Sequence, residues 1–351
     1  MNKKKKKVLL AGIDGLTHYR VEMFDMLCEN YELTIAHTND ALPNTKFSQV
    51  KVYPNKKGPF FTVKDLPKLS EYDVVIFSFN IRILNIYLEL FKKRNYKLLF
   101  FGIGVSASYH NQYDENKKLD KLRRYLIKKS DGAIFYEHYP LIKYQSLKID
   151  PNKLHVAYNT VVSPKSFKFS NKTFESFMFI GTLYKQKKIY DLLHAYELLY
   201  SKLKDRTPRL EIVGDGDEYN NINSWIHEKG LNGKIILHGK ITNEEDLLPI
   251  FERALVCVSP GQAGLSVQKS FSYGTPFITT KKAITGGELF CIINQVNGFI
   301  YNGKVEDLSK LMGNIAERIY DIESISKNAL MFYSNFRTPD IWKNAFVEAI
   351  G

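Results

Sequence analysis

The feature that most constrains this chain of 351 residues is a series of short, continuous apolar runs that alternate with helical patterns. A continuous run, unlike an alternating one, predicts a strand that is covered on both faces. Strands that alternate with helices indicate parallel sheets, so we expect an α/β fold. The runs predict strands at residues 8–11, 33–36, 74–79, 98–101, 133–136, 156–158, 177–180, 210–213, 235–237, 255–258 and 277–279.

A polar stretch with a proline and no periodicity, residues 163–170, interrupts this series and predicts an interdomain linker. We therefore expect two doubly wound, Rossmann-like domains at residues 1–162 and 171–325. Ligands of such sheets bind outside the carboxyl ends of the strands, so two facing domains would create a central cleft. Residues 326–351 are expected to form helices that could pack back on the first domain.

The composition is that of a globular protein with a strong basic bias. Hydrophobic residues make up 44% and charged residues 25%, while the net charge is +13. This charge favours polyanionic partners, of which nucleic acid is not expected because no nucleic-acid-binding motif is present. No apolar run approaches the ~20 residues of a membrane span. The five lysines at residues 3–7 precede no signal-peptide core, so we expect a cytoplasmic protein.

Residues 117–129 form a basic amphipathic segment that has two interpretations. Leu119, Leu122 and Leu126 fall on one helical stripe surrounded by lysines and arginines. An interfacial helix on anionic lipid has this pattern, which would place the protein at the inner face of the cell membrane. An ordinary surface helix whose apolar stripe faces the core has it as well.

Residues 259–287 contain a glycine loop that leads from one predicted buried strand into a short helix and then into a second strand. The start of a helix offers unpaired N–H groups and the positive end of a dipole, which together bind anions such as a diphosphate. An ordinary strand-to-helix turn is the alternative.

Five motifs in the second half occur in a characteristic order. They are F-I-G-T-L-Y-K-Q-K-K (179–188), I-V-G-D-G-D (212–217), L-H-G-K-I (237–241), the glycine loop (259–287) and N-G-F-I (297–300). This series resembles the donor-binding domain of glycosyltransferase family 4, which has the two-domain GT-B fold. The first half resembles that family more loosely, at residues 12–20 and 156–161.

The resemblance implies roles for several residues in donor binding. Lys187 matches the lysine that binds the donor diphosphate, and Ile241 matches a position near the nucleobase. The backbone amides of Gly264, Leu265 and Ser266 match the loop that approaches the phosphates.

The chain also departs from the family pattern. Thr182 stands where the family has an arginine, and Gly261 and Lys269 stand where it has two glutamates. Lys269 could add a cation near the phosphates or simply solvate its helix. Glu288 could hydrogen-bond a sugar hydroxyl.

The catalytic residue does not transfer from the family, whose histidine in the first domain falls on Ile103. Candidates therefore come from residue type. Asp14 and His18 lie on the first loop, where either could be the general base toward an acceptor hydroxyl. His110 is a further candidate. Such a base suits an inverting reaction, whereas family 4 is generally retaining.

We therefore expect a glycosyltransferase that uses a nucleotide-diphosphate sugar as co-substrate, with no metal and no other cofactor. The acceptor would be a glycan or polyprenyl-linked intermediate of surface polysaccharide synthesis, and the enzyme could contact an anionic membrane. One alternative is a catalytically silent GT-B partner of an active transferase, as the lost glutamates suggest. A sugar-nucleotide epimerase is less favoured, because the motifs follow the transferase order.

Overall fold

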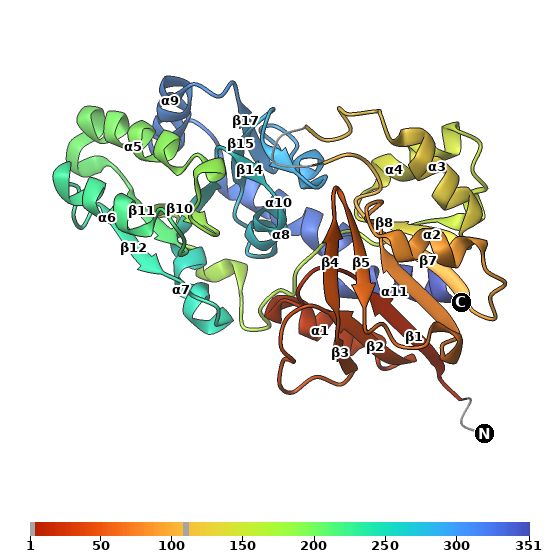
Figure 1. The fold of residues 1–351 in the computed structure, drawn as a ribbon. Coiled ribbons are helices and arrows are strands. Elements are labelled where there is room, and N and C mark those ends of the chain that lie inside the picture. The colour runs from red at the N-terminus through yellow and green to blue at the C-terminus, as the bar shows by residue number, and fades with distance from the viewer. Residues whose placement is uncertain (1–3, 108–111) are drawn as a thin grey trace. The chain divides into compact units, whose positions relative to one another are not determined.

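The computed structural model describes residues 4–107 and 112–351, which form two compact units (Figure 1). The first unit contains residues 4–106, 114–162 and 339–351, and the second consists mainly of residues 163–338. The chain thus returns to the first unit with its last helix, α11.

The first unit is built on a seven-stranded parallel sheet in the order β3-β2-β1-β6-β7-β8-β9. From β1 to β3 the chain adds strands toward one edge of the sheet, and from β6 to β9 it adds them toward the other edge. The strands are β1 Lys6–Ala11, β2 Tyr31–His37, β3 Ser48–Lys51, β6 Val74–Ser78, β7 Lys97–Gly102, β8 Gly132–Phe135 and β9 Leu154–Val156. A separate antiparallel hairpin, β4 Tyr53–Lys57 and β5 Phe60–Lys64, follows β3.

Helices cover both faces of this sheet. Helices α2, α3 and α4 bury one apolar cluster, and α1 and α11 bury the other. Their bounds are α1 His18–Leu27, α2 Leu84–Phe91, α3 Asp120–Lys129, α4 His138–Ser146 and α11 Pro339–Ile350. Trp342 and Phe346 of α11 pack edge-on against Phe24 and Phe101, with ring centroids 5.8 and 4.8 Å apart.

The second unit has a six-stranded parallel sheet in the order β12-β11-β10-β13-β15-β17. Its strands are β10 Ser176–Ile180, β11 Arg209–Val213, β12 Ile235–Gly239, β13 Ala254–Val258, β15 Phe277–Thr280 and β17 Gly298–Tyr301. Its helices are α5 Ile189–Leu203, α6 Tyr219–Glu228, α7 Glu244–Arg253, α8 Leu265–Ser272, α9 Val305–Ala316 and α10 Ile322–Phe336. Two short strands, β14 Gln262–Ala263 and β16 Ile284–Thr285, pair beside the main sheet.

The predicted fold class is confirmed, because both units are doubly wound α/β structures with parallel central sheets. Every predicted apolar run contributes to a strand. The run at 156–158 was placed too late, since β9 ends at Val156, where its neighbour β8 ends at Phe135. Strands β3, β4 and β5 were missed because their residues are largely exposed and form no continuous apolar run.

The amphipathic segment at residues 117–129 forms α3, and its leucine stripe faces the core. Leu126 is fully buried, and Leu122 packs against the same apolar cluster. Leu119, which precedes the helix, is 46% exposed. The leucine stripe is therefore that of an ordinary surface helix. In the described part of the chain no helix is both long enough and apolar enough to cross a bilayer.

Candidate functional site

The strand order of the second unit brings three loops together at the carboxyl edge of its sheet. Strand β10 lies between β11 and β13, so the loops that follow β10 and β13 are neighbours at the point where the order reverses. The Gly261 amide donates to the Lys187 carbonyl at 3.0 Å, and the Ile284 amide donates to the Gly261 carbonyl at 2.9 Å. Backbone hydrogen bonds thus fix the relative positions of the loops at residues 181–188, 259–264 and 281–288.

Lys187 is a buried cation in this set of loops. It ends a short 3-10 turn, Lys185–Lys187, and is only 8% exposed, whereas Lys185 at the start of the turn is exposed. Its ammonium lies against the end of β10, since a Cβ built on Gly181 would be 3.2 Å from Lys187 Nζ. No hydrogen bond or ion pair to this ammonium occurs among the residues described.

Burial lowers the pKa of Lys187 to about 8, and the nearby Cys257 and Glu288 oppose that shift. The ring of Tyr184 lies 5.7 Å from the ammonium, and the Tyr184 hydroxyl donates to Gln262 Oε1. Sequence reasoning missed this tyrosine and glutamine, because no pattern connects residues so far apart. A buried ammonium that forms no ion pair with a described residue is suited to receive an anionic ligand.

The start of α8 adds a second feature that favours an anion. Gly264 precedes the helix without a side-chain cap, so the first N–H groups of α8 have no partner within the helix. The Ser266 hydroxyl is buried and has no hydrogen-bond partner in the part of the chain that the structure describes. Leu265 and Ser266 form the first turn of α8, which begins at the end of the loop that is bonded to Lys187.

Glu288 is also close to Lys187, but at least part of its carboxylate is directed toward its own loop. The side chain is 3% exposed, and its Oε2 accepts from the Gly286 amide at 3.0 Å and from the Thr285 hydroxyl at 3.4 Å. The predicted contact of Glu288 with a sugar hydroxyl stays a prediction.

Gly261 cannot carry any side chain in this backbone. A Cβ built there would lie 2.1 Å from the Gln186 carbonyl oxygen and 2.7 Å from the Lys187 carbonyl carbon. The glutamate that the family resemblance leads one to expect at this position is therefore excluded by the close approach of the Lys185–Lys187 turn.

Lys269, at the second expected glutamate, forms an ion pair with Glu244 on the first turn of α7. The Lys269 side chain is 13% exposed, and that of Glu244 is 42% exposed. The Tyr273 hydroxyl also donates to Glu244, at 2.7 Å. Lys269 is thus largely buried and paired with an acid, and its predicted role as a cation near the phosphates stays a prediction. Glu244 was missed, since the sequence gives no signal for its pairing.

Two further predicted donor residues lie on loops at the same edge of the sheet. Thr182 is exposed just beyond β10, and Ile241 is half-buried in the loop that leads from β12 to α7. The Gly214 amide donates to the Gly239 carbonyl at 2.8 Å, which joins the loop after β11 to the end of β12.

The candidate bases do not belong to this group of loops. Asp14 and His18 are exposed in the first unit, on the loop after β1 and at the first residue of α1. His110 lies outside the described residues. Within residues 4–107 and 112–351, no three His, Cys, Asp or Glu side chains are grouped as metal ligands.

Comparison with known proteins agrees with this geometry. The profile of the family described as glycosyl transferases group 1 matches residues 164–329, which span the donor loops. No curated protein sequence matches the chain significantly.

Solved structures are similar over nearly the whole chain at low sequence identity. HepE from Anabaena in complex with UDP is 14% identical, with 98% of this chain and 99% of HepE covered and a TM-score of 0.70. A glycosyltransferase from Rickettsia africae is 15% identical over 99% of this chain and 98% of its own, with a TM-score of 0.70. The lipopolysaccharide outer core galactosyltransferase WaaB is 15% identical over 98% and 99%, with a TM-score of 0.64.

Proposed function

Because residues 164–329 belong to the glycosyl transferases of group 1 and the chain has the GT-B fold, we propose that it transfers a sugar from a nucleotide-diphosphate sugar. The acceptor that we propose is a glycan or lipid-linked glycan of surface polysaccharide synthesis. WaaB, which has the same fold, is named for such a role. We place the reaction in the cytoplasm, at the inner face of the cell membrane.

One observation carries the proposal: the backbone bond between Gly261 and Lys187 joins the turn of a buried lysine to the loop that starts α8. A diphosphate bound there would meet the ammonium of Lys187, the first amides of α8 and the Ser266 hydroxyl. As the bond between the anomeric carbon and the phosphate oxygen breaks, negative charge grows on the leaving nucleotide. Fixed positive groups stabilise that charge more than they stabilise the intact donor.

The first unit would supply the acceptor side. His18 or Asp14 would accept the proton of the acceptor hydroxyl as general base, which suits an inverting transfer. Lys187 and the helix dipole would neutralise the diphosphate without a metal. We therefore expect transfer to persist in the presence of EDTA.

A second candidate function is a catalytically silent partner of an active transferase. The structure at Gly261 favours keeping this candidate, since no carboxylate can approach the transferred sugar from that position. The epimerase alternative finds no further support in the geometry.

The test measures nucleotide binding by calorimetry and sugar transfer with a panel of nucleotide sugars, with and without lipid-linked acceptors. Binding together with acceptor-dependent release of the nucleoside diphosphate is the expected result. Binding without turnover would identify the silent partner, and interconversion of free nucleotide sugars would identify an epimerase. The absence of any nucleotide binding would refute the donor site itself.

A further inference from the structure

The first unit exposes a set of large apolar side chains on two neighbouring helices. Leu88 and Phe91 of α2 are 62% and 69% exposed, and Tyr125 of α3 is 41% exposed. Phe91 is the most exposed of the large hydrophobic residues that the structure describes. The rings of Phe91 and Tyr125 are 6.5 Å apart, so the exposed residues of the two helices form one surface.

Helix α2 is apolar on the face that it buries and also on the face that it exposes. Ile86 and Leu90 belong to the core cluster, while Leu88 and Phe91 point away from it. The polar side chains of α2, among them Asn85 and Glu89, do not cover Leu88 and Phe91, so these two residues leave an apolar patch on the exposed face of the helix.

Positive charge surrounds this apolar surface. Lys121, Lys128 and Lys129 are the i−4, i+3 and i+4 neighbours of Tyr125 on α3, so they lie around the exposed ring. Arg124 is also exposed on α3, and Lys93 is exposed just beyond α2. In residues 117–129, seven side chains are Lys or Arg and one is Asp.

The acidic side chains of these elements are already paired. Glu89 of α2 accepts from Lys92 at 2.6 Å and from Tyr96 at 2.7 Å. Asp131, which follows α3, pairs with Arg94 at 3.3 Å. Among the described residues, Lys93, Lys121, Arg124 and Lys128 form no ion pair. The net charge that this surface presents to a partner is therefore positive.

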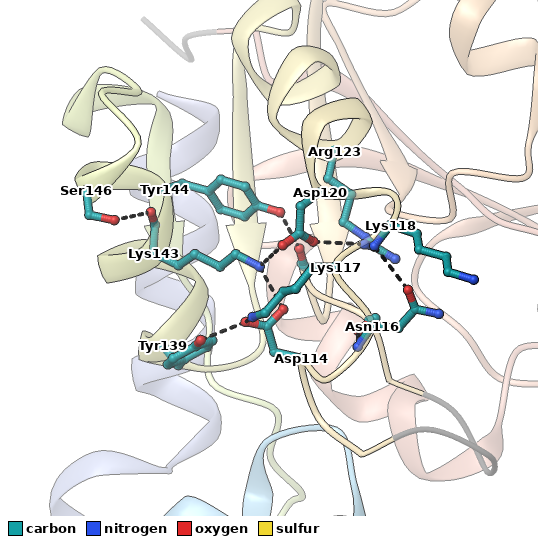
Figure 2. A network of polar contacts seen from close by, with 12 residues as sticks. Asp114, Asn116, Lys117, Lys118, Asp120, Arg123, Tyr139, Lys143, Tyr144 and Ser146 are labelled. Atoms are coloured by element: carbon teal, nitrogen blue, oxygen red, sulfur yellow. Dashed lines mark hydrogen bonds and ion pairs between the residues drawn. The ribbon is translucent and has the colours of Figure 1, made fainter.

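A polar network fixes the start of α3 in place (Figure 2). Lys143 of α4 donates to Asp114 and to Asp120, at 2.7 Å in each case, and Arg123 donates to Asp120 at 3.2 Å. Lys117 and Tyr139 bond to the same Asp114 carboxylate. These cations serve the fold, which leaves the outer lysines of α3 as the ones available to a partner.

We propose that this surface of α2 and α3 docks the protein on an anionic lipid bilayer. Its apolar residues are Leu88, Phe91 and Tyr125, and its cations are Lys93, Lys121, Arg124, Lys128 and Lys129. Exposed aromatic and aliphatic side chains within a ring of lysines are the features of an interfacial membrane contact. The apolar side chains enter the boundary between headgroups and acyl chains, and the lysines bind lipid phosphates. The acids beside this surface in the described part of the chain, Glu89 and Asp131, are each paired with a cation, which reduces their repulsion of those phosphates. The proposal specifies the membrane contact of the proposed transferase, but it does not depend on the donor site.

The test is flotation of the full chain with vesicles of phosphatidylcholine, with or without phosphatidylglycerol, at low and high salt. We expect binding only with phosphatidylglycerol, and weaker binding at high salt. Each lysine near an anionic surface is worth about fivefold in affinity, so Lys121→Glu with Lys128→Glu should weaken binding at least ~25-fold. Leu88→Ser with Phe91→Ser should weaken it about tenfold or more.

A matched control keeps the test specific. Leu198 and Lys202 lie on α5 of the second unit, and Leu198 is 45% exposed. Leu198→Ser with Lys202→Glu should leave vesicle binding unchanged, and so should Lys187→Met, which tests the donor site alone. Equal loss in the α5 variant, or full binding by both surface variants, would overturn the proposal. The proposal would also be overturned if the protein did not bind vesicles and instead formed a dimer that Phe91→Ser dissociates. That result would make the surface a protein interface.

Discussion

Gly261 lies directly against the main chain of Gln186, so close that a Cβ on Gly261 would be 2.1 Å from the Gln186 carbonyl oxygen. The two residues belong to the loops that follow β13 and β10, and the Gly261 amide bonds to the Lys187 carbonyl. The backbone contact that positions Lys187 is thus the same contact that excludes a side chain at residue 261.

Gly261→Glu, which restores the glutamate expected from the family pattern, should therefore damage the fold instead of improving transfer. The new side chain would force the two loops apart, at a cost of about 3 kcal/mol or more. Thermal unfolding should show a Tm that is lower by roughly 6–12 °C. Gly264→Ala is the matched control for stability, because a Cβ there meets nothing closer than 3.7 Å. An unchanged Tm in Gly261→Glu would contradict the close contact.

Much of the fold could be predicted because it follows from local patterns. The continuous run at 255–258 lies within β13, whose residues are all buried. The GT-B resemblance rested on ordered motifs, and it is confirmed. The exposed hairpin of β4 and β5 escaped prediction because an exposed ribbon needs no apolar pattern.

The candidate site was less predictable, because its chemistry depends on contacts between distant segments. No sequence rule pairs Glu244 with Lys269 or places the Gln186 carbonyl against Gly261. The burial of Lys187, and hence its lowered pKa, depends on the whole arrangement of loops around it. The roles of Asp14, His18, Thr182 and Ile241 stay predictions.

Nucleotide affinity should fall as the pH rises above about 8, because burial holds the pKa of Lys187 in the ligand-free protein at about 8. A bound diphosphate favours the ammonium and raises this pKa, so binding above pH 8 takes up a proton. The expected loss is about tenfold per pH unit until the pKa of the bound state is reached.

The nucleotide also titrates, so the pH dependence that comes from Lys187 has to be separated from that of the ligand. Calorimetry of Lys187→Met and Lys185→Met beside the wild type makes this separation. Lys187→Met should bind roughly 10- to 100-fold more weakly at pH 7 and lose the extra pH dependence. Lys185→Met, altered in the same turn but at an exposed position, should behave like the wild type. A wild-type pH profile equal to that of Lys187→Met would show that the lysine does not bind the diphosphate.

The pair formed by Glu244 and Lys269 should respond asymmetrically to substitution. Lys269 is the more buried partner, so Glu244→Gln leaves a buried ammonium without its counter-ion and should cost about 1–3 kcal/mol. Lys269→Met leaves a carboxylate that is 42% exposed and can be hydrated, so it should cost less than about 1 kcal/mol. Urea unfolding of both single variants and the double variant measures these values, and equal single costs would contradict the difference in burial.

Stability should rise with pH just above neutrality because of Lys172. Its ammonium donates to the Phe251 carbonyl at 2.8 Å and to the Thr275 hydroxyl at 3.0 Å, yet burial lowers its pKa to about 7. The unfolded chain, with an ordinary lysine pKa, binds more protons than the folded chain above pH 7. The free energy of unfolding should therefore increase by up to about 1.4 kcal/mol per pH unit from this group.

Lys172→Met should remove this part of the slope between pH 7 and pH 8, whereas Lys187, whose folded-state pKa is about 8, titrates in both proteins and cancels in the comparison. Above about pH 8, where Lys172 is neutral in the folded wild type, the variant should also be less stable, because the Phe251 and Tyr273 carbonyls lose their shared donor. The quantity to compare between wild type and variant is therefore the slope of the free energy of unfolding against pH, measured by urea unfolding at several pH values. Histidines and surface groups titrate equally in both proteins and cancel. Parallel slopes would mean that Lys172 stays charged in the folded protein throughout this range.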